Sequence, residues 1–156
     1  RNHLTDKAMQ SADRTAGRQL FEKSCANCHR LFDAGGTIGP DITGSQRTNL
    51  DYLLENLIDP SAAVAKDYQM ETIETDSGRV VTGLVIAETP RAVTIQTISE
   101  QLVVPITEID VRAKSELSMM PEGLLQNLSR DQVRDLIAYR SGIEQVPLPE
   151  IEIEGQ

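Results

Sequence analysis

The sequence predicts an α+β fold, in which helices near the two ends enclose a small antiparallel β segment. Apolar residues recur at helical spacing within residues 11–29, 49–58 and 129–142. β-Branched residues dominate two runs within residues 67–112, and turn-forming residues separate these runs. We therefore expect an all-α domain that carries an antiparallel β insertion of 46 residues, 67 to 112, after its second helix.

The N-terminal part of the chain predicts two helices joined by a loop. Ser11 and Asp13 are both good N-cap residues for the first helix. Residues 33–40 are rich in glycine and end in proline, which predicts an irregular loop. The second helix is expected over 49–58, where leucine and isoleucine form one broad apolar face, and Pro60 ends it.

The β segment is expected to be a meander of about four antiparallel strands. Its clearest runs are residues 80–86 and 92–98, with turn residues on either side. Pro105 interrupts a further apolar run, and a proline cannot donate a hydrogen bond to a neighbouring strand. We therefore expect that strand to lie at an edge of the sheet or at a bulge.

The last helix is expected to begin at Ser129 and to end near Gly142. Ser129 and Gln132 have the spacing of a capping box, and glycine is a common helix stop. Residues 1–10 and 143–156 are interpreted as tails. The whole then forms a single domain over residues 11–142.

Composition excludes several classes of function. The 156 residues include 15 Lys and Arg against 24 Asp and Glu, and the formal net charge of −9 disfavours binding to nucleic acid. No apolar run exceeds four residues, so no membrane-spanning helix is expected. The chain begins without Met and without a signal-peptide pattern, which favours a processed chain or an excised fragment with any targeting segment upstream. Only five aromatic residues are present, and a bound apolar cofactor would help to fill the core.

One motif carries recognisable chemistry: Cys25-Ala-Asn-Cys28-His29 has the Cys-x-x-Cys-His pattern of c-type haem attachment. Two thiols three residues apart can each form a thioether with one haem vinyl group, and the adjacent imidazole can ligate the iron. A zinc site is poorly supported, because the chain has only two Cys and two His. A thioredoxin-like pair would follow a strand and begin a helix, whereas this pair ends a helix. A disulfide between Cys25 and Cys28, or a pair of free thiols, stays open as an alternative to haem attachment.

An electron-carrying haem iron needs a second axial ligand. The His and Met side chains outside the motif are His3, Met9, Met70, Met119 and Met120. An isolated Met is usually a core residue, but the sequence Met-Met-Pro in a loop after a haem motif favours a ligand at 119 or 120.

The chain resembles class I c-type cytochromes over about residues 13–66 and 114–142. The resemblance rests on Gly17 and Phe21, the Cys-x-x-Cys-His motif, Gly39-Pro40, the Met-Pro at 120–121, and Leu136 with Tyr139. With its β segment and the sequences Leu-Ile-Asp-Pro-Ser and Asp-Leu-Ile-Ala-Tyr, it is similar to the planctomycete-type haem-binding domain family. Such domains are commonly parts of larger extracytoplasmic proteins.

The resemblance implies a role for each matching residue. Cys25 and Cys28 would hold one covalent haem c, and His29 would be the proximal iron ligand. The Pro40 carbonyl would orient the imidazole. Met120 would be the distal ligand, with Met119 as the alternative. Gly17 would allow close approach of the first and last helices, with Phe21 against Leu136 and Tyr139.

The leading functional hypothesis is an electron-transfer cytochrome and not an enzyme. The alternatives are a haem enzyme of peroxidase type, which needs an open distal site and an acid or base, and a haem-free interaction module with a Cys25–Cys28 disulfide. The expected partners are redox proteins and a parent multidomain polypeptide, and the expected location is periplasmic or extracytoplasmic. The β insertion is interpreted either as a rigid decoration or as a docking element. Arg47 is expected at the surface, with a haem propionate as its alternative partner.

Overall fold

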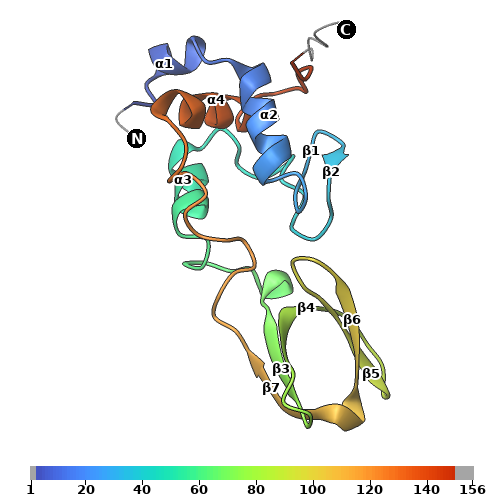
Figure 1. Ribbon diagram of the computed structural model, residues 1–156. Helices are drawn as coiled ribbons and strands as arrows, with labels where there is room; N and C mark the ends of the chain where they lie inside the picture. Colours follow the sequence, from blue (N-terminus) through green and yellow to red (C-terminus); the bar gives the residue numbers. More distant parts are fainter. Residues whose placement is uncertain (1–2, 150–156) are drawn as a thin grey trace, which may run out of the picture. The chain divides into compact units, whose positions relative to one another are not determined.

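The computed structural model describes residues 3–149 and divides the chain into two compact units (Figure 1). Residues up to 58 and from 123 onward form one, here called the helical unit, and residues 59–122 form the other, the β unit. The β unit is longer at both ends than the expected insertion of 67–112. The parts of the predicted tails at 1–2 and 150–156 lie outside the described residues.

The helical unit contains four described α-helices: α1 (Asp6–Gln10), α2 (Arg14–Ser24), α3 (Leu50–Ile58) and α4 (Arg130–Arg140). The Asp13 carboxylate caps α2 by accepting from the backbone N–H groups of Thr15 and Ala16. The capping box expected from Ser129 and Gln132 is present at the start of α4. The three predicted helices are therefore confirmed, and Asp13 is the cap of the first one.

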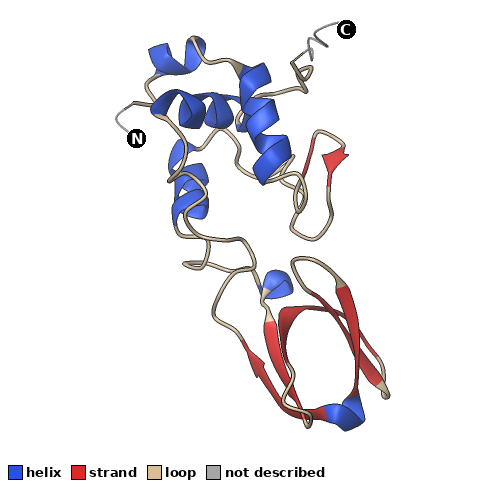
Figure 2. Ribbon diagram, viewed as in Figure 1, coloured by secondary structure: helices blue, strands red, loops and turns tan. Residues whose placement is uncertain are grey.

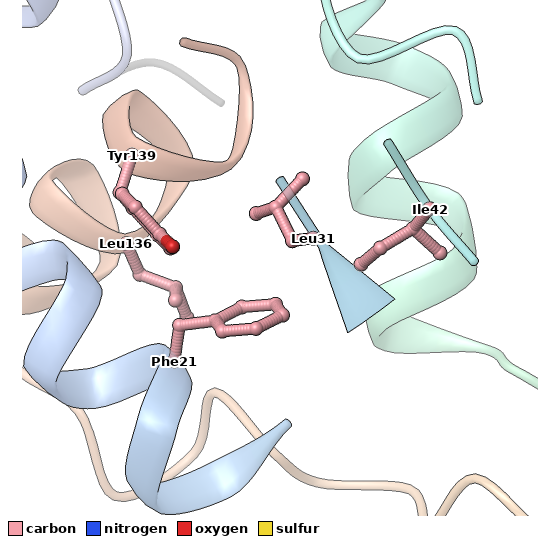
Figure 3. Packing of buried hydrophobic residues seen from close by; sticks show 5 residues of the cluster. All are labelled: Phe21, Leu31, Ile42, Leu136 and Tyr139. Carbon is pink, nitrogen blue, oxygen red and sulfur yellow. The ribbon is translucent and has the colours of Figure 1, made fainter. Parts of the chain in front are cut away.

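Helices α2 and α4 pack closely because α2 has no side chain at Gly17. A Cβ built on Gly17 would lie 2.5 Å from the Asp135 carbonyl carbon and 2.9 Å from Tyr139 Cβ. One turn further along, the Phe21 and Tyr139 rings pack edge to face with centroids 5.5 Å apart. Figure 3 shows the five buried side chains of this core converging from α2, α4 and the chain between them: Phe21, Leu31, Ile42, Leu136 and Tyr139. The predicted roles of Gly17 and Phe21 are confirmed.

Both expected tails contain ordered structure within the described residues. Residues 6–10 form α1, capped by the Thr5 side chain, and Leu4 is buried. After α4, the Val146 side chain packs against the helical core and its carbonyl oxygen accepts from the Arg18 guanidinium. Residues 6–10 are therefore helical where a tail was expected, whereas residues 143–149 form no helix or strand, and Val146 holds them against the helical core.

A short hairpin replaces part of the loop expected at 33–40. Strand β1 (Arg30–Leu31) pairs with β2 (Ala34–Gly35) through a two-residue turn. Phe32 and Asp33 form that turn with φ of 50° and 66°, as type I′ hairpins require. Phe32 is an unusual residue there, and its ring packs edge to face against Tyr139.

The β unit is built around a curved antiparallel sheet (Figure 2). Its strands are β3 (Glu71–Thr75), β4 (Val80–Glu88), β5 (Ala92–Gln96), β6 (Gln101–Pro105) and β7 (Ile109–Lys114), in the spatial order β6-β5-β4-β3-β7. Five strands are therefore present where about four were expected. Pro105 ends β6, which is an edge strand, as its missing N–H predicted.

The β unit has its own apolar core, made by one face of the sheet. The buried side chains come from four of the five strands: Ile73, Val81, Val93, Ile95 and Val104. A bulge between Val85 and Ala87 interrupts the pairing of β4 with β5, and bulges increase the local bend and twist of a strand. This curvature lets a small sheet enclose its own core.

Candidate functional site

The Cys-x-x-Cys-His motif lies at the C-terminal end of α2, in a tight turn that continues the helix. The Cys25 N–H donates to the Phe21 carbonyl oxygen (2.8 Å). The Cys28 and His29 N–H groups both donate to the Cys25 carbonyl oxygen, over 3.1 and 2.9 Å. The backbone of one turn thus fixes both thiols and the imidazole in the helical unit.

The two cysteines are free thiols, and both are half-buried. Cys25 packs against the helical core, and this burial raises the pKa of its thiol to about 11. The Cys25 thiol is therefore protonated at neutral pH. Reactive redox cysteines have a lowered thiol pKa, so the environment of Cys25 does not favour a thioredoxin-like role.

His29 is held by the loop that follows the hairpin. Its Nδ1 lies 2.9 Å from the Pro40 carbonyl oxygen, and since a carbonyl only accepts, Nδ1 carries the proton. Gly39 lies against the same ring, because a Cβ there would be 2.8 Å from His29 Cε1. Burial lowers the pKa of the imidazole, although the Pro40 contact opposes that shift. A neutral ring with protonated Nδ1 leaves the Nε2 lone pair for a metal.

These residues fit a covalently attached haem. The donor set consists of two thiols, Cys25 and Cys28, that are not joined to each other, and one imidazole, His29, oriented through its far nitrogen. The glycine at position 39 leaves the space beside the ring that any larger residue would fill. The described residues contain no group of three or more His, Cys, Asp or Glu that could hold a metal ion by themselves.

The predicted distal ligands belong to the β unit, in the segment that follows β7. Met119 and Met120 are both half-buried. The Met120 N–H donates to Ser118 Oγ (3.1 Å), and the Ser118 N–H donates to Ser61 Oγ (3.1 Å). These bonds tie the methionine loop to the start of the β unit. The choice of Met120 over Met119 stays a prediction.

Arg47 was expected at the surface, but the structure places it in a half-buried position. Its guanidinium donates to the Gly142 carbonyl oxygen just after α4, and it lies 4.8 Å from the centroid of the Phe32 ring. A hydrogen bond to this carbonyl and a cation–π contact with the Phe32 ring hold it there.

Sequence reasoning missed a second arginine of the same unit, Arg140. It is the last residue of α4, and its guanidinium nitrogens lie 3.5 Å from the Ile42 carbonyl oxygen and 3.5 Å from Ser45 Oγ. Burial lowers the pKa of this guanidinium. The sequence signal that could have indicated Arg140 was its position, because it is a charged residue directly after the apolar run Leu136-Ile-Ala-Tyr139.

Comparison with known proteins supports one family. Residues 15–79 match the family model of cytochrome c. The match contains most of α2, the Cys-x-x-Cys-His motif and Pro40, and it ends before β4. No curated protein matches the chain. None of the helices described for residues 3–149 is long and apolar enough to cross a membrane. The match supports a c-type cytochrome, and cytochrome c domains are usually haem-binding electron carriers.

Proposed function

We propose that this chain is an electron-transfer cytochrome that holds one covalent haem c at Cys25 and Cys28, with His29 and Met120 as the axial ligands of the iron. The observation that carries the proposal is the turn at the end of α2, which presents two free thiols and a neutral imidazole whose Nδ1 is fixed by Pro40.

Each residue of the turn has a distinct task. Cys25 and Cys28 each supply a sulfur for a thioether bond, which makes attachment irreversible. The Pro40 carbonyl holds the imidazole in one tautomer and one orientation, so that His29 presents Nε2 to the iron. When bound, the haem supplies a one-electron couple between ferric and ferrous iron.

Met120 completes the coordination in this proposal. A thioether is a weak, soft ligand. It stabilises ferrous iron more than a second imidazole would, and so raises the reduction potential. The Ser118 side chain holds the Met120 backbone, which supports a fixed loop. Met119 is the alternative, because adjacent side chains differ only in the register of that loop.

We infer that the protein works outside the cytoplasm, in the periplasm or a comparable compartment, with redox proteins as partners and within a larger polypeptide. The cytochrome c match supports this setting, because such domains are typically extracytoplasmic in bacteria. The formal charge of −9 favours a basic redox partner. An electron carrier needs no catalytic acid or base, and the residues of the turn supply none beyond the ligating His29.

The absorption spectrum of the oxidised and reduced protein tests the ligation. We expect a Soret band and, in the oxidised protein, the weak long-wavelength band of iron–thioether ligation. Met120→Ala should abolish that weak band, whereas the matched variant Met119→Ala should keep it. The opposite pattern would reassign the ligand to Met119. A wild-type protein with a Soret band and no thioether band would refute Met ligation and favour an open, peroxidase-type site.

A further inference from the structure

The strongest unexplained feature of the helical unit is Arg140. Within residues 3–149, its guanidinium reaches only uncharged acceptors, the Ile42 carbonyl and the Ser45 hydroxyl, and both contacts are long at 3.5 Å. Arg134, on the same helix, is different, since its guanidinium lies 2.9 Å from carboxylate oxygens of both Asp131 and Asp135. Among the residues described, Arg140 has no carboxylate within ion-pairing distance.

The segment 39–45 connects this guanidinium to the proximal imidazole. At one end, Gly39 lies against the His29 ring and the Pro40 carbonyl oxygen is 2.9 Å from Nδ1. At the other end, Ile42 and Ser45 accept from Arg140. Arg140 and His29 are therefore bound to one stretch of seven residues, 39 to 45, within one compact unit.

The field of Arg140 reaches the attachment motif. The positive charge contributes to the lowered pKa of His29, and it opposes the burial that raises the pKa of Cys25. An arginine side chain stays protonated under all ordinary conditions. Because Arg140 is half-buried and no carboxylate of residues 3–149 is paired with it, water and salt screen its charge less than that of an exposed residue.

We propose that Arg140 raises the reduction potential of the iron that His29 ligates, by placing a half-buried positive charge, which no carboxylate of the described residues pairs, beside the proximal side of the site. This inference rests on the proposed function. Reduction adds one electron from a donor protein or a chemical reductant, and no bond is made or broken and no proton is transferred. The reduced site carries one positive charge less, so a nearby cation repels it less than the oxidised site.

The test is a spectroelectrochemical titration of the holoprotein and three variants. Arg140→Gln removes the charge and keeps hydrogen-bond donors, and Arg140→Lys keeps the charge. Arg130→Gln removes one positive charge from the exposed start of the same helix, so it matches the change in net charge. We expect Arg140→Gln to shift the equilibrium constant for reduction about tenfold toward the oxidised form, which is about 59 mV for one electron.

The control variants separate the effect of the local charge of Arg140 from the effect of a change in net charge and from disruption of the structure. Arg140→Lys should stay within about threefold of the wild type, and Arg130→Gln should change less than Arg140→Gln, most clearly at high salt, where exposed charges are screened. Equal shifts in Arg140→Gln and Arg130→Gln, or a shift in Arg140→Gln that vanishes at high salt, would overturn the proposal. If Arg140→Gln does not accumulate as holoprotein, Arg140→Met takes its place with the same expected shift. A wild-type protein without a Soret band would refute the proposed function instead.

Discussion

Replacing Gly17 by alanine should force α2 and α4 apart. The new Cβ would lie 2.5 Å from the Asp135 carbonyl carbon and 2.9 Å from Tyr139 Cβ. The Asp135 carbonyl oxygen would lie closer still, and since an ordinary contact needs about 3.4 Å, the helices must separate by more than about 0.9 Å. Both obstacles are backbone or Cβ atoms, which no rotamer change can move. The separation also loosens the packing of Phe21 against Tyr139.

The magnitude follows from two opposing effects. Overpacking of a close helix contact costs about 1–3 kcal/mol, and this site lies at the upper end because backbone must move. Alanine in a helix gains up to about 1 kcal/mol over glycine. We therefore expect Gly17→Ala to lower the free energy of unfolding by about 2 kcal/mol, which corresponds to a Tm roughly 4–8 °C lower for a chain of this size.

The assay is thermal and denaturant unfolding of the holoprotein, followed through the haem absorption, which reports the surroundings of the attachment turn at the end of α2. Gly44→Ala is the matched control, because a Cβ on Gly44 meets nothing within 4 Å, and we expect its effect to stay within about 0.5 kcal/mol. Equal stability of Gly17→Ala and Gly44→Ala would refute the argument that the absence of a side chain at position 17 is what lets the two helices pack.

Three further predictions concern other parts of the chain. Ser129→Ala should cost about 1 kcal/mol in denaturant unfolding, whereas Ser129→Gly should cost only a few tenths, because alanine is the poorer N-cap; equal costs would contradict the capping role. Arg112 hydrogen-bonds the Glu88 carboxylate and lowers its pKa, so the contribution of this pair is present above the ordinary glutamate range and is lost as pH falls through the lowered pKa. In an NMR titration, Arg112→Gln should return the pKa of Glu88 toward its ordinary value while Arg79→Gln should not, and unchanged titration in Arg112→Gln would contradict the assignment. Reduction by a basic partner protein should slow as salt rises, since the chain carries −9; faster reduction by an acidic partner at low salt would rule out steering.

Elements with strong periodic or capping signals were predictable from the sequence. The three long helices have apolar faces or cap residues that can be recognised in the local sequence. Asp13 and the Ser129–Gln132 pair are examples. Pro105 indicated an edge strand or a bulge, because it has no N–H to donate to a neighbouring strand, and β6 is an edge strand. Gly17 was expected at a helix contact through family resemblance, and the structure shows the reason.

The missed elements lack such signals. Helix α1 has five residues, too few for periodicity, and depends on the Thr5 cap. Strand β7 is exposed along nearly its whole length, so no apolar alternation marks it. The hairpin turn at Phe32 and Asp33 has positive φ without glycine, so its sequence resembles an ordinary loop.

The candidate site likewise contains features that the sequence could predict and features that it could not. The attachment motif is contiguous, so five residues of sequence contained it. The burial of Arg140 depends on tertiary contacts with residues 42 and 45, which are nearly a hundred positions away. No local pattern could have shown that this arginine lacks a carboxylate partner among the described residues. Met119 and Met120 were identified by their loop context, and their ligation stays a prediction.

The most direct test of the central claim is the intact mass of the denatured protein, produced in a host that matures c-type cytochromes. Denaturation removes every non-covalent ligand, so only thioether bonds at Cys25 and Cys28 can retain a haem. We predict the mass of the chain plus one haem, and the mass of the chain alone for the double variant Cys25→Ala/Cys28→Ala. A wild-type chain at its apo mass from the same host would contradict covalent attachment, and with it the proposed function.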